Sequence, residues 1–382
     1  MNVGIMEEEL NFEELYDAYL SCLKRKKNKV GTYEFVNSDL CKNLISLLDS
    51  LNNRTYKPNK SNYYVVTDPA LREIFAASFK DRVVQHFYMN KINNVLESEL
   101  VDGCCSCRKN KGTDYALKLL KDYVVNVSNH GRKDCYFLKI DLSGYFMSID
   151  RNIVNNKFKK LIKDKYKGKH KDLLLYLTPI IFLNNPALNC NYKCSDKVRN
   201  MVPERRCMKQ NSMCGLAIGN LTSQAASNLN LNNFDHYVIE DLGLTNYVRY
   251  VDDIIIVSDS KDRLKEVMNL IINKLCETNQ LLNTKKTRIE SCYHGITFLG
   301  RITYPYGYQK PSKKVISRTL YKTRNIIYKS KLSLLSSLNS SIGILKNYNC
   351  RKLIFEYVDK ILNRFSNFVS FDYMLLKFSL SN

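Results

Sequence analysis

Long apolar runs are missing from this sequence of 382 residues. No stretch stays apolar for the roughly 18 residues that a membrane-spanning helix needs, so we expect no membrane contact. The acidic first segment, Met1 to Leu10, lacks the apolar core of a secretory leader, which favours a cytoplasmic protein. Internal repeats and low-complexity segments are absent as well. What remains is a chain with 45% hydrophobic residues, long enough for about two or three folding units.

Disulfide patterns and regularly spaced metal ligands are also missing. The 13 cysteines are scattered along the chain, which is typical of reduced thiols in a cytoplasm. One cluster, Cys190, Cys194, Cys207 and Cys214, has irregular spacing, no CxxC pair and no histidine within it. Zinc sites normally show regular pairs of Cys or His, so we expect no zinc there. The 5 histidines show no mutual spacing that suggests a metal or nuclease site.

Acidic residues are scarce relative to basic ones. The chain has 59 Lys and Arg against 37 Asp and Glu, a formal net charge of +22. One interpretation is a compositional bias, because Lys and Asn are abundant throughout. The other is a polyanionic partner, whose phosphates and condensed counterions favour such a charge. The charge alone does not decide between these two interpretations.

The spacing of apolar residues predicts alternating helices and strands. Helical spacing covers about residues 7–27, 38–52, 71–96, 114–126, 151–166, 222–241 and 261–280. Strand-like runs cover about residues 63–66, 135–140, 245–250, 254–258, 296–299 and 301–304. Residues 184–213 are polar and irregular, and about 311–375 are helical and basic. This order predicts an α+β fold with helices on one face of an antiparallel sheet.

Two adjacent acids lie in the sequence Tyr250-Val251-Asp252-Asp253, at a tight turn between two apolar strands. Asp is common in turns for purely structural reasons. Two features speak against that explanation here. No Gly or Asn accompanies the pair to supply a positive φ, and the flanking strands are too apolar for a casual surface hairpin. We therefore expect both acids at the edge of a buried sheet.

A third acid, Asp141, also follows an apolar strand. Adjacent strands of one sheet would bring it next to Asp252. Clustered carboxylates repel one another unless a cation neutralises them, and Mg²⁺ is the hard, oxygen-seeking cation for such a site. Two such ions, with Mn²⁺ as a substitute, would activate a 3′-hydroxyl and stabilise a leaving pyrophosphate. The expected reaction is nucleotidyl transfer by in-line displacement.

Five segments resemble motifs A to E of reverse transcriptases, and they occur in that order. They are residues 137–146 for motif A, 215–224 for motif B, 250–253 for motif C, 283–287 for motif D and 298–300 for motif E. The resemblance covers about residues 55–345 and implies a right-hand polymerase with fingers, palm and thumb. It implies an RNA-directed DNA polymerase that copies template RNA into cDNA. The expected partners are dNTPs, the template RNA and the RNA–cDNA hybrid.

The resemblance also implies roles for individual residues. Asp141, Asp252 and Asp253, with the backbone of Leu142, would hold the metal ions, and Lys286 would donate a proton near the pyrophosphate. Phe146 follows the first acid by five residues, and its ring would clash with a ribose 2′-hydroxyl. The other expected substrate-binding residues are Arg72, Arg82, Arg108, Lys111, Ile218, Gly219, Gln224 and Tyr250.

The domain boundaries follow from the same resemblance. We expect an N-terminal helical extension over 1–54, fingers over 55–134, a palm over 135–308 and a helical thumb over 309–382. The palm would carry part of the fingers and the insertion at about 184–213. The thumb is rich in basic residues, which are Lys310, Lys313, Lys314, Arg318, Lys322, Arg324, Lys329 and Lys331. Those at 314, 318 and 322 recur every four residues, a stripe suited to a nucleic-acid backbone, although a solvated helix face would look the same.

The motif B segment ends in Ser223-Gln224, where many reverse transcriptases have Gln-Gly. This variant resembles diversity-generating retroelement reverse transcriptases, as do the segments 72–76, 107–113 and 340–343. The resemblance implies error-prone copying at adenines and a small basic accessory protein. The sequence departs from that group at Ala217, where Pro is usual, and at 206–209.

Three alternatives stay open. Reverse transcriptases of retrons and antiphage defence share the same palm. A catalytically inactive polymerase fold could serve as an RNA-binding scaffold, although the intact acids speak against it. An RNA-dependent RNA polymerase would lack the steric gate that Phe146 suggests.

Overall fold

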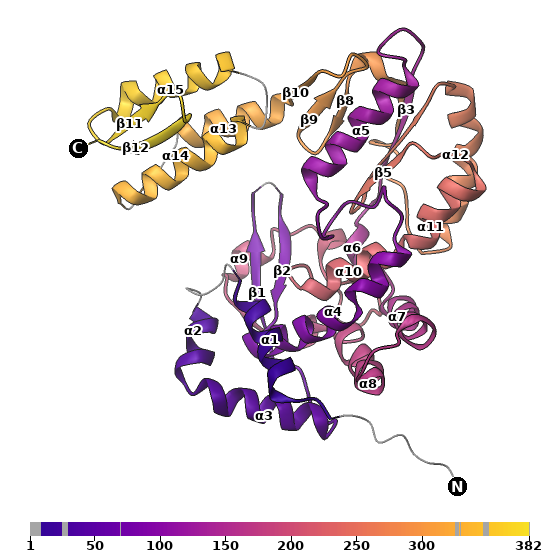
Figure 1. Ribbon diagram of the computed structural model, residues 1–382, viewed down its shortest axis with the longest axis vertical. Coiled ribbons are helices and arrows are strands. Elements are labelled where there is room, and N and C mark those ends of the chain that lie inside the picture. The colour runs from indigo at the N-terminus through magenta and orange to yellow at the C-terminus, as the bar shows by residue number, and fades with distance from the viewer. Residues whose placement is uncertain are drawn as a thin grey trace. The chain divides into compact units, whose positions relative to one another are not determined.

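The computed structural model describes residues 9–24, 30–68, 70–324, 328, 330–346 and 351–381 (Figure 1). The chain divides into two compact units. The first consists of residues 1–112, 140–254 and 266–287, and the second of residues 113–139, 255–265 and 288–382. Helices alternate with mainly antiparallel strands along the chain, which confirms the α+β class predicted from the sequence.

Three helices open the first unit: α1 (Phe12–Leu23), α2 (Val30–Asn37) and α3 (Leu40–Asn52). At the start of α1 the Asn11 side chain accepts a hydrogen bond from the N–H of Glu14, and the Glu14 side chain accepts one from the N–H of Asn11. Helix α1 is shorter than the predicted 7–27, and residues 7, 8 and 25–27 of that prediction lie outside the described residues. Helix α1 packs on α4 (Phe79–Glu99), where Lys91 pairs with Glu14.

A small sheet in the order β2-β1-β4 follows. Its strands are β1 (Ser61–Val66), β2 (Arg72–Ala76) and β4 (Cys190–Tyr192), with β1 antiparallel to β2 and parallel to β4. The helix predicted from residue 71 is wrong over 72–76. Buried Glu73 and Phe75 alternate there with more exposed neighbours, which is the period of a strand. The helix begins only at Phe79, after the capping side chain of Ser78.

The core of the first unit is a group of helices. Helices α7 (Arg151–Lys165), α8 (Lys171–Phe182) and α10 (Leu221–Asn230) pack on one another and on α4. Phe158 and Phe182 stack with ring centroids 4.3 Å apart, and Tyr88 meets Phe182 edge-on at 5.9 Å. Beyond α10 the helical path continues through α11 (Asn232–His236) and a π-helical turn (Tyr237–Asp241), which confirms the helix predicted over 222–241.

A four-stranded sheet has the strand order β5-β6-β3-β7. Its strands are β5 (Tyr247–Tyr250), β6 (Asp253–Ser258), β3 (Tyr136–Asp141) and β7 (Arg288–Ser291). Strand β3 pairs antiparallel with β7 on one side and is a neighbour of β6 on the other. Asp141 ends β3 and Asp253 begins β6, so the two apolar strands predicted to carry the acids are adjacent, as the three-acid hypothesis requires.

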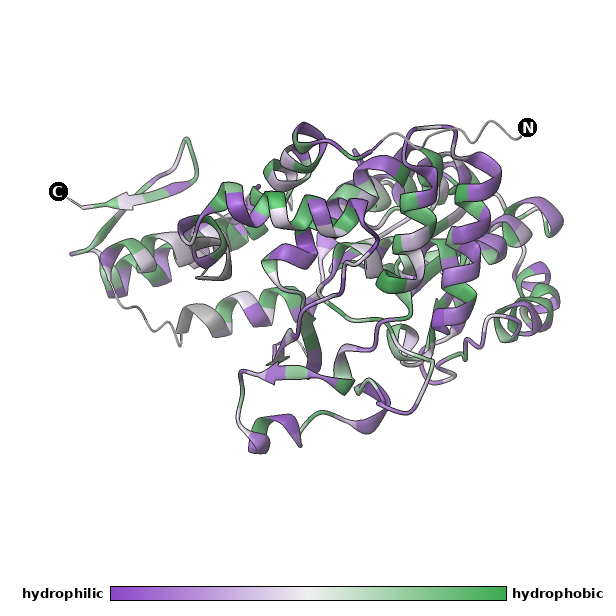
Figure 2. Ribbon diagram, turned by 90° about the horizontal axis from the view of Figure 1, so that it is seen from below, coloured by the Kyte–Doolittle hydropathy of each residue, from purple (hydrophilic) through white to green (hydrophobic). Residues whose placement is uncertain are grey.

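The second unit contains a three-stranded antiparallel sheet and most of the C-terminal helices. The elements are α5 (Thr113–Val127), β8 (Ile296–Phe298), β9 (Arg301–Thr303), β10 (Gln309–Pro311), α13 (Lys313–Arg324), α14 (Lys331–Lys346) and α15 (Arg351–Phe365). Helix α12 (Lys261–Cys276) confirms the helix predicted from 261. Figure 2 shows hydrophobic and hydrophilic residues alternating along the helices, the pattern of helices that pack one face on a core.

The chain ends in a hairpin that the helical prediction for 311–375 missed. Strands β11 (Val369–Asp372) and β12 (Lys377–Leu380) pair antiparallel. Val369 and Phe378 are buried in one core with Leu338 and Ile361 of the preceding helices, so packing decides the conformation here. Of the basic residues expected on the thumb, Lys329 and the side chains of 322 and 324 lie outside the described part. None of the described helices is long and apolar enough to cross a membrane.

Candidate active site

The turn between β5 and β6 carries two acids in a strained backbone. Val251 has φ +61°, a left-handed conformation that β-branched residues rarely adopt. Such a conformation costs on the order of 1–3 kcal/mol and persists only where the surroundings impose it. The turn contains no Gly or Asn, and the residue that adopts the left-handed conformation is Val251. The turn presents Asp252 and Asp253 at the end of the buried strand β6.

Asp141 is held from the segment that resembles motif D. The Asn283 side chain donates to one carboxylate oxygen at 2.9 Å, and its backbone N–H donates to the Asp141 carbonyl at 2.8 Å. The Lys286 ammonium lies 3.0 and 3.2 Å from the two carboxylate oxygens. The Asp141 side chain is 15% exposed and that of Lys286 61%, so an exposed cation covers a nearly buried acid.

The electrostatics join the three acids into one site. The pKa of Asp252 is raised to about 6, first by burial and then by the negative charges of Asp253 and Asp141. The positive charge of Arg72 acts in the opposite direction, so this predicted triphosphate ligand lies within electrostatic reach of the acids. Repulsion of this kind stabilises a cation that binds among the three carboxylates.

The three carboxylates are ligands of the kind that a hard divalent cation prefers. Within the described residues, no three His, Cys, Asp or Glu side chains are arranged to hold a metal ion as they stand. The two carboxylate oxygens of Asp141 accept hydrogen bonds from Lys286 and Asn283. The donor set consists of carboxylates that repel one another, and the Lys286 ammonium already binds there as a positive charge. The side chain of Leu142 has no donor atom, so this residue could contribute only its backbone carbonyl as a ligand.

The segment that resembles motif B lies against β2. The N–H of Phe75 donates to the carbonyl of Ile218 at 3.0 Å, and the Asn220 side chain accepts from the N–H of Ala77 at 3.3 Å. Gly219 has φ +115°, and a Cβ there would lie 3.0 Å from the Ile74 side chain. Glycine is therefore required for this close approach. The docking ties β2, which carries Arg72, to the same unit as the acids.

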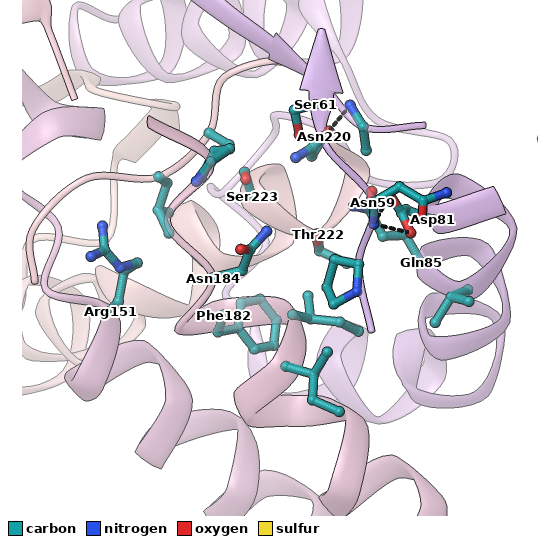
Figure 3. A pocket seen from close by; sticks show the side chains of 18 of the residues that line it. Asn59, Ser61, Asp81, Gln85, Arg151, Phe182, Asn184, Asn220, Thr222 and Ser223 are labelled. Carbon is teal, nitrogen blue, oxygen red and sulfur yellow. Dashed lines mark hydrogen bonds between the residues drawn. The ribbon is translucent and has the colours of Figure 1, made fainter. Parts of the chain in front are cut away.

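A small polar pocket lies beside this segment (Figure 3). Asn220, Thr222 and Ser223 line it together with Asp81 and others. Arg151 also borders it and donates to the carbonyls of 212, 214 and 215 at 2.6 to 3.2 Å. These bonds fix the backbone that leads into residues 215–224 and supply carbonyl acceptors to the buried Arg151 side chain.

Phe146 ends the segment that resembles motif A, and its backbone is bonded to the segment that resembles motif B. Its ring is half-buried and meets Tyr145 edge-on at 5.7 Å, and its carbonyl accepts the N–H of Leu216 at 2.8 Å. The position of Phe146 is thus fixed by the packed ring of Tyr145 and by the backbone hydrogen bond from Leu216. The role of Phe146 as a steric gate stays a prediction.

Arg108 is bound within its own loop and the end of α4. Its guanidinium donates to the Glu97 carboxylate at 2.7 Å and to the backbone carbonyls of 97, 100, 101 and 104. These five bonds use all five N–H groups of the side chain, so none is left for a substrate. Lys111 similarly bonds the side chain and carbonyl of Asp102 at 2.8 Å. Both side chains thus brace the loop that they belong to, and their roles in substrate binding stay predictions.

The remaining predicted residues lie in the first unit. Arg82 donates to the carbonyl of Ala77 at 3.0 Å, so it supports the junction between β2 and α4. Gln224 is exposed in the first turn of α10 and borders a cavity that Cys107 also lines. Tyr250 is half-buried next to the strained Val251. Substrate contacts for these residues stay predictions.

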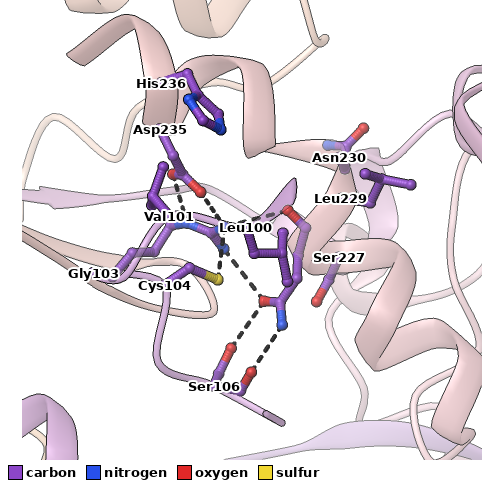
Figure 4. A network of polar contacts seen from close by, with 12 residues as sticks. Leu100, Val101, Gly103, Cys104, Ser106, Ser227, Leu229, Asn230, Asp235 and His236 are labelled. Atoms are coloured by element: carbon purple, nitrogen blue, oxygen red, sulfur yellow. Dashed lines mark hydrogen bonds and ion pairs between the residues drawn. The ribbon is translucent and has the colours of Figure 1, made fainter. Parts of the chain in front are cut away.

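A buried network behind the turn was missed by sequence reasoning (Figure 4). Arg249 and Asp235 are both fully buried and form an ion pair. Arg249 also reaches the turn itself, because it donates to the carbonyl of Val251 at 3.2 Å. The available signal was a charged residue in the apolar strand before the acids, since a buried arginine requires a partner. Asn283, which holds Asp141, was part of a predicted motif but was given no role.

A family model described as reverse transcriptase (RNA-dependent DNA polymerase) matches residues 59–303. The chain belongs to the reverse transcriptase family. Among solved structures, telomerase from Candida tropicalis is similar, with 14% identity, a TM-score of 0.51, and coverage of 80% of this chain and 57% of that one. Telomerase from Candida albicans with a fragment of telomeric RNA gives 13% identity, a TM-score of 0.48, and coverage of 81% and 58%.

The chain spans less than two thirds of the length of these telomerases. At such low identities the likeness to Candida tropicalis telomerase shows the fold alone, and this reverse transcriptase fold is consistent with a right-hand polymerase. No curated protein matches the sequence.

Proposed function

We propose that this reverse transcriptase copies template RNA into cDNA by nucleotidyl transfer at Asp141, Asp252 and Asp253. One observation carries the proposal: the strand that ends at Asp141 and the strand that begins at Asp253 are neighbours in one sheet, and the charges of both acids raise the pKa of the half-buried Asp252, although Asp141 lies far away in the sequence. A bound cation would relieve the mutual repulsion of such a cluster, so it points to chemistry.

Mg²⁺ ions, with Mn²⁺ as a substitute, would be held by the three acids and the carbonyl of Leu142. When bound, they would supply charge stabilisation at the attacking 3′-oxygen and at the leaving pyrophosphate. The ammonium of Lys286, which contacts Asp141 in this structure, would give a proton to the departing pyrophosphate. Because Lys286 is exposed, a change of rotamer would be enough to move its ammonium from Asp141 to that position.

Two further residues fit the incoming nucleotide. Arg72 is exposed, begins β2 and lies within electrostatic reach of Asp252, so we assign it to the triphosphate. Phe146 is half-buried beside motif B, and we assign it to the face of the deoxyribose. The template RNA and the RNA–cDNA hybrid would bind through the excess of 22 positive charges, including Lys313, Lys314 and Arg318.

Primer extension on an RNA template tests the function. Asp252→Asn keeps the size of the side chain and removes its charge, so we expect incorporation of dNTPs to fall by at least about 10³-fold. The matched control is Asp262→Asn on α12, because Asp262 is 81% exposed and its ion pair is with Lys265, within one turn of the same helix. Equal synthesis by wild type and Asp252→Asn would contradict the role of Asp252, and no synthesis by either would favour the alternative of an inactive RNA-binding scaffold.

At a finer level we propose the diversity-generating retroelement group, on the strength of the segments 72–76, 107–113, 218–224 and 340–343. This proposal includes error-prone copying and a small basic accessory protein as partner. Sequencing of the cDNA tests it, because errors concentrated opposite template adenines are expected. Uniformly faithful copying would contradict it and favour a retron-type or antiphage-defence enzyme.

A further inference from the structure

The strained Val251 has both of its backbone polar groups bound by side chains from elsewhere in the first unit. Its N–H donates to the hydroxyl of Ser106 at 3.2 Å, and its carbonyl accepts from Arg249 at 3.2 Å. A left-handed valine is unfavourable by itself, so these two contacts oppose its relaxation to a negative φ. A relaxed turn would re-aim Asp252 and Asp253, which follow immediately in the chain.

Ser106 is oriented by Asn228 on α10. The Ser106 hydroxyl donates to the Asn228 side-chain oxygen at 3.0 Å, and the Asn228 amide donates back to the Ser106 carbonyl at 2.8 Å. The reciprocal pair leaves the Ser106 oxygen directed at the N–H of Val251. Ser106 and Asn228 are each 1% exposed, so water does not compete for these bonds.

Arg249 is fixed from the other side. Its guanidinium donates to both carboxylate oxygens of Asp235, to the Asn228 carbonyl at 3.2 Å and to the Cys104 sulfur at 3.2 Å. Burial alone would lower the pKa of Arg249, but the charge of Asp235 raises it well above the ordinary value, so the cation is kept. The ion pair thus directs a permanently charged donor at the turn.

The loop before Ser106 delivers it to this place. The backbone N–H of Arg249 donates to the carbonyl of Gly103 at 2.8 Å and its carbonyl accepts the N–H of Cys105 at 2.9 Å, so the loop forms an isolated parallel bridge to β5 at Cys104. A Cβ on Gly103 would lie 2.3 Å from the Tyr247 carbonyl, so only glycine allows this approach. The five bonds of Arg108 hold the same loop from behind, which gives that residue an indirect part in the site.

We propose that Ser106, Asn228 and Arg249 are positioning residues that hold Val251 in its left-handed conformation and thereby aim Asp252 and Asp253. The inference rests on the proposed function for its kinetic consequence. It adds that the loop over 101–108 sets the catalytic geometry through the backbone of Val251 rather than by touching substrate.

A double-mutant cycle tests the proposal in the full chain by single-turnover primer extension. Ser106→Ala should lower the rate by about 10-fold to 10²-fold with little change in KM for dNTP, because displaced carboxylates weaken the transition state. In a Val251→Gly background the same substitution should cost less than about threefold. Glycine adopts a positive φ without strain, so it no longer needs the restraint. Equal losses in both backgrounds, or no loss in either, would overturn the proposal.

The matched control is Ser128→Ala. Ser128 is also fully buried, and its hydroxyl also accepts a backbone N–H, that of Gly131 at 3.0 Å. It should lower the thermal midpoint by a similar amount to Ser106→Ala while leaving the rate unchanged. A rate loss as large as that of Ser106→Ala would reduce the role of Ser106 to general stability and contradict the proposal.

Hydrogen exchange provides a readout that does not depend on activity. In metal-free protein, Ser106→Ala should speed exchange in the peptide that contains the Val251 amide and leave peptides of α7 unchanged. Unchanged exchange at the turn would contradict the network. If the wild-type chain incorporates no dNTP, the proposed function fails, whereas the exchange comparison still decides whether the network restrains the turn.

Discussion

The two sides of the active site are built in opposite ways. Asp141 is covered by Lys286, an exposed cation on a flexible stem, together with one amide. Asp252 and Asp253 stand on a turn whose backbone is fixed by side chains that are almost completely buried. The contact that covers Asp141 is therefore exchangeable, whereas the turn that carries Asp252 and Asp253 is rigid. Under the proposed function, a cation and substrate would enter by displacing a surface lysine while the geometry of the other two acids stays constant.

The largest expected effect is on stability, and it distinguishes the turn that carries Asp252 and Asp253 from the contact between Lys286 and Asp141. Arg249→Met leaves Asp235 charged, buried and unpaired, which should cost about 3–5 kcal/mol of unfolding free energy. Lys286→Gln breaks a pair whose cation is 61% exposed, so its cost should stay below about 1 kcal/mol. Urea unfolding of both variants measures the difference.

A companion variant makes this comparison sharper. Arg249→Met combined with Asp235→Leu removes the unpaired charge and should recover part of the stability without restoring activity. Similar small losses for Arg249→Met and Lys286→Gln would show that the buried pair does not hold the turn.

The next effect is on the rate of incorporation and concerns Lys286, which covers Asp141. Lys286→Gln should slow single-turnover incorporation by about 10²-fold because the proton donor is lost. The adjacent Lys285→Gln serves as control, since Lys285 is exposed and has no assigned role. Equal rates for the two variants would exclude Lys286 as the proton donor.

The proposed catalytic acids were easier to locate from the sequence than the residues that hold them in place. Asp141 and the pair at 252–253 were predictable because each follows an apolar strand, and strand order then brings them together. The contacts of Arg108 were not predictable because a basic residue looks the same in sequence whether it faces solvent or a carboxylate and four carbonyls. The pairing of Asp235 with Arg249 was invisible because it joins a helix to a strand through tertiary packing. The strand over 72–76 was misread because its apolar residues also fit a helical spacing.

Two arginines allow a third comparison, between substrate binding and scaffolding. Arg72→Ala should raise KM for dNTP by about tenfold with little change in thermal midpoint, because one charge-assisted contact to the triphosphate is lost. Arg108→Ala should instead lower the thermal midpoint, since it leaves several buried carbonyls without donors. Steady-state kinetics and thermal unfolding of both variants check this, and a reversal of the two patterns would contradict the assignment.

The smallest effect is a pH dependence on the rigid side. The folded-state pKa of Asp252 is about 6, above its ordinary value of 3.8. The folded metal-free protein thus binds this proton more tightly than the unfolded chain, so this contribution to stability is present below about pH 4 and is lost as pH rises through about 6. Asp252→Asn should remove that part of the decline in thermal midpoint between pH 4 and 7. An identical decline in wild type and variant would show that folding does not raise the pKa of Asp252.

The central claim is that three acids from two adjacent strands share a bound cation, and Mn²⁺ binding to the full chain tests it most directly. Titration followed by the electron paramagnetic resonance signal of free Mn²⁺ should show binding at pH 7.5 to wild type and to Asp262→Asn. Asp141→Asn and Asp252→Asn should each weaken that binding by about tenfold or more. Binding that is unchanged in Asp141→Asn would contradict the claim, because it would place the cation away from the shared site.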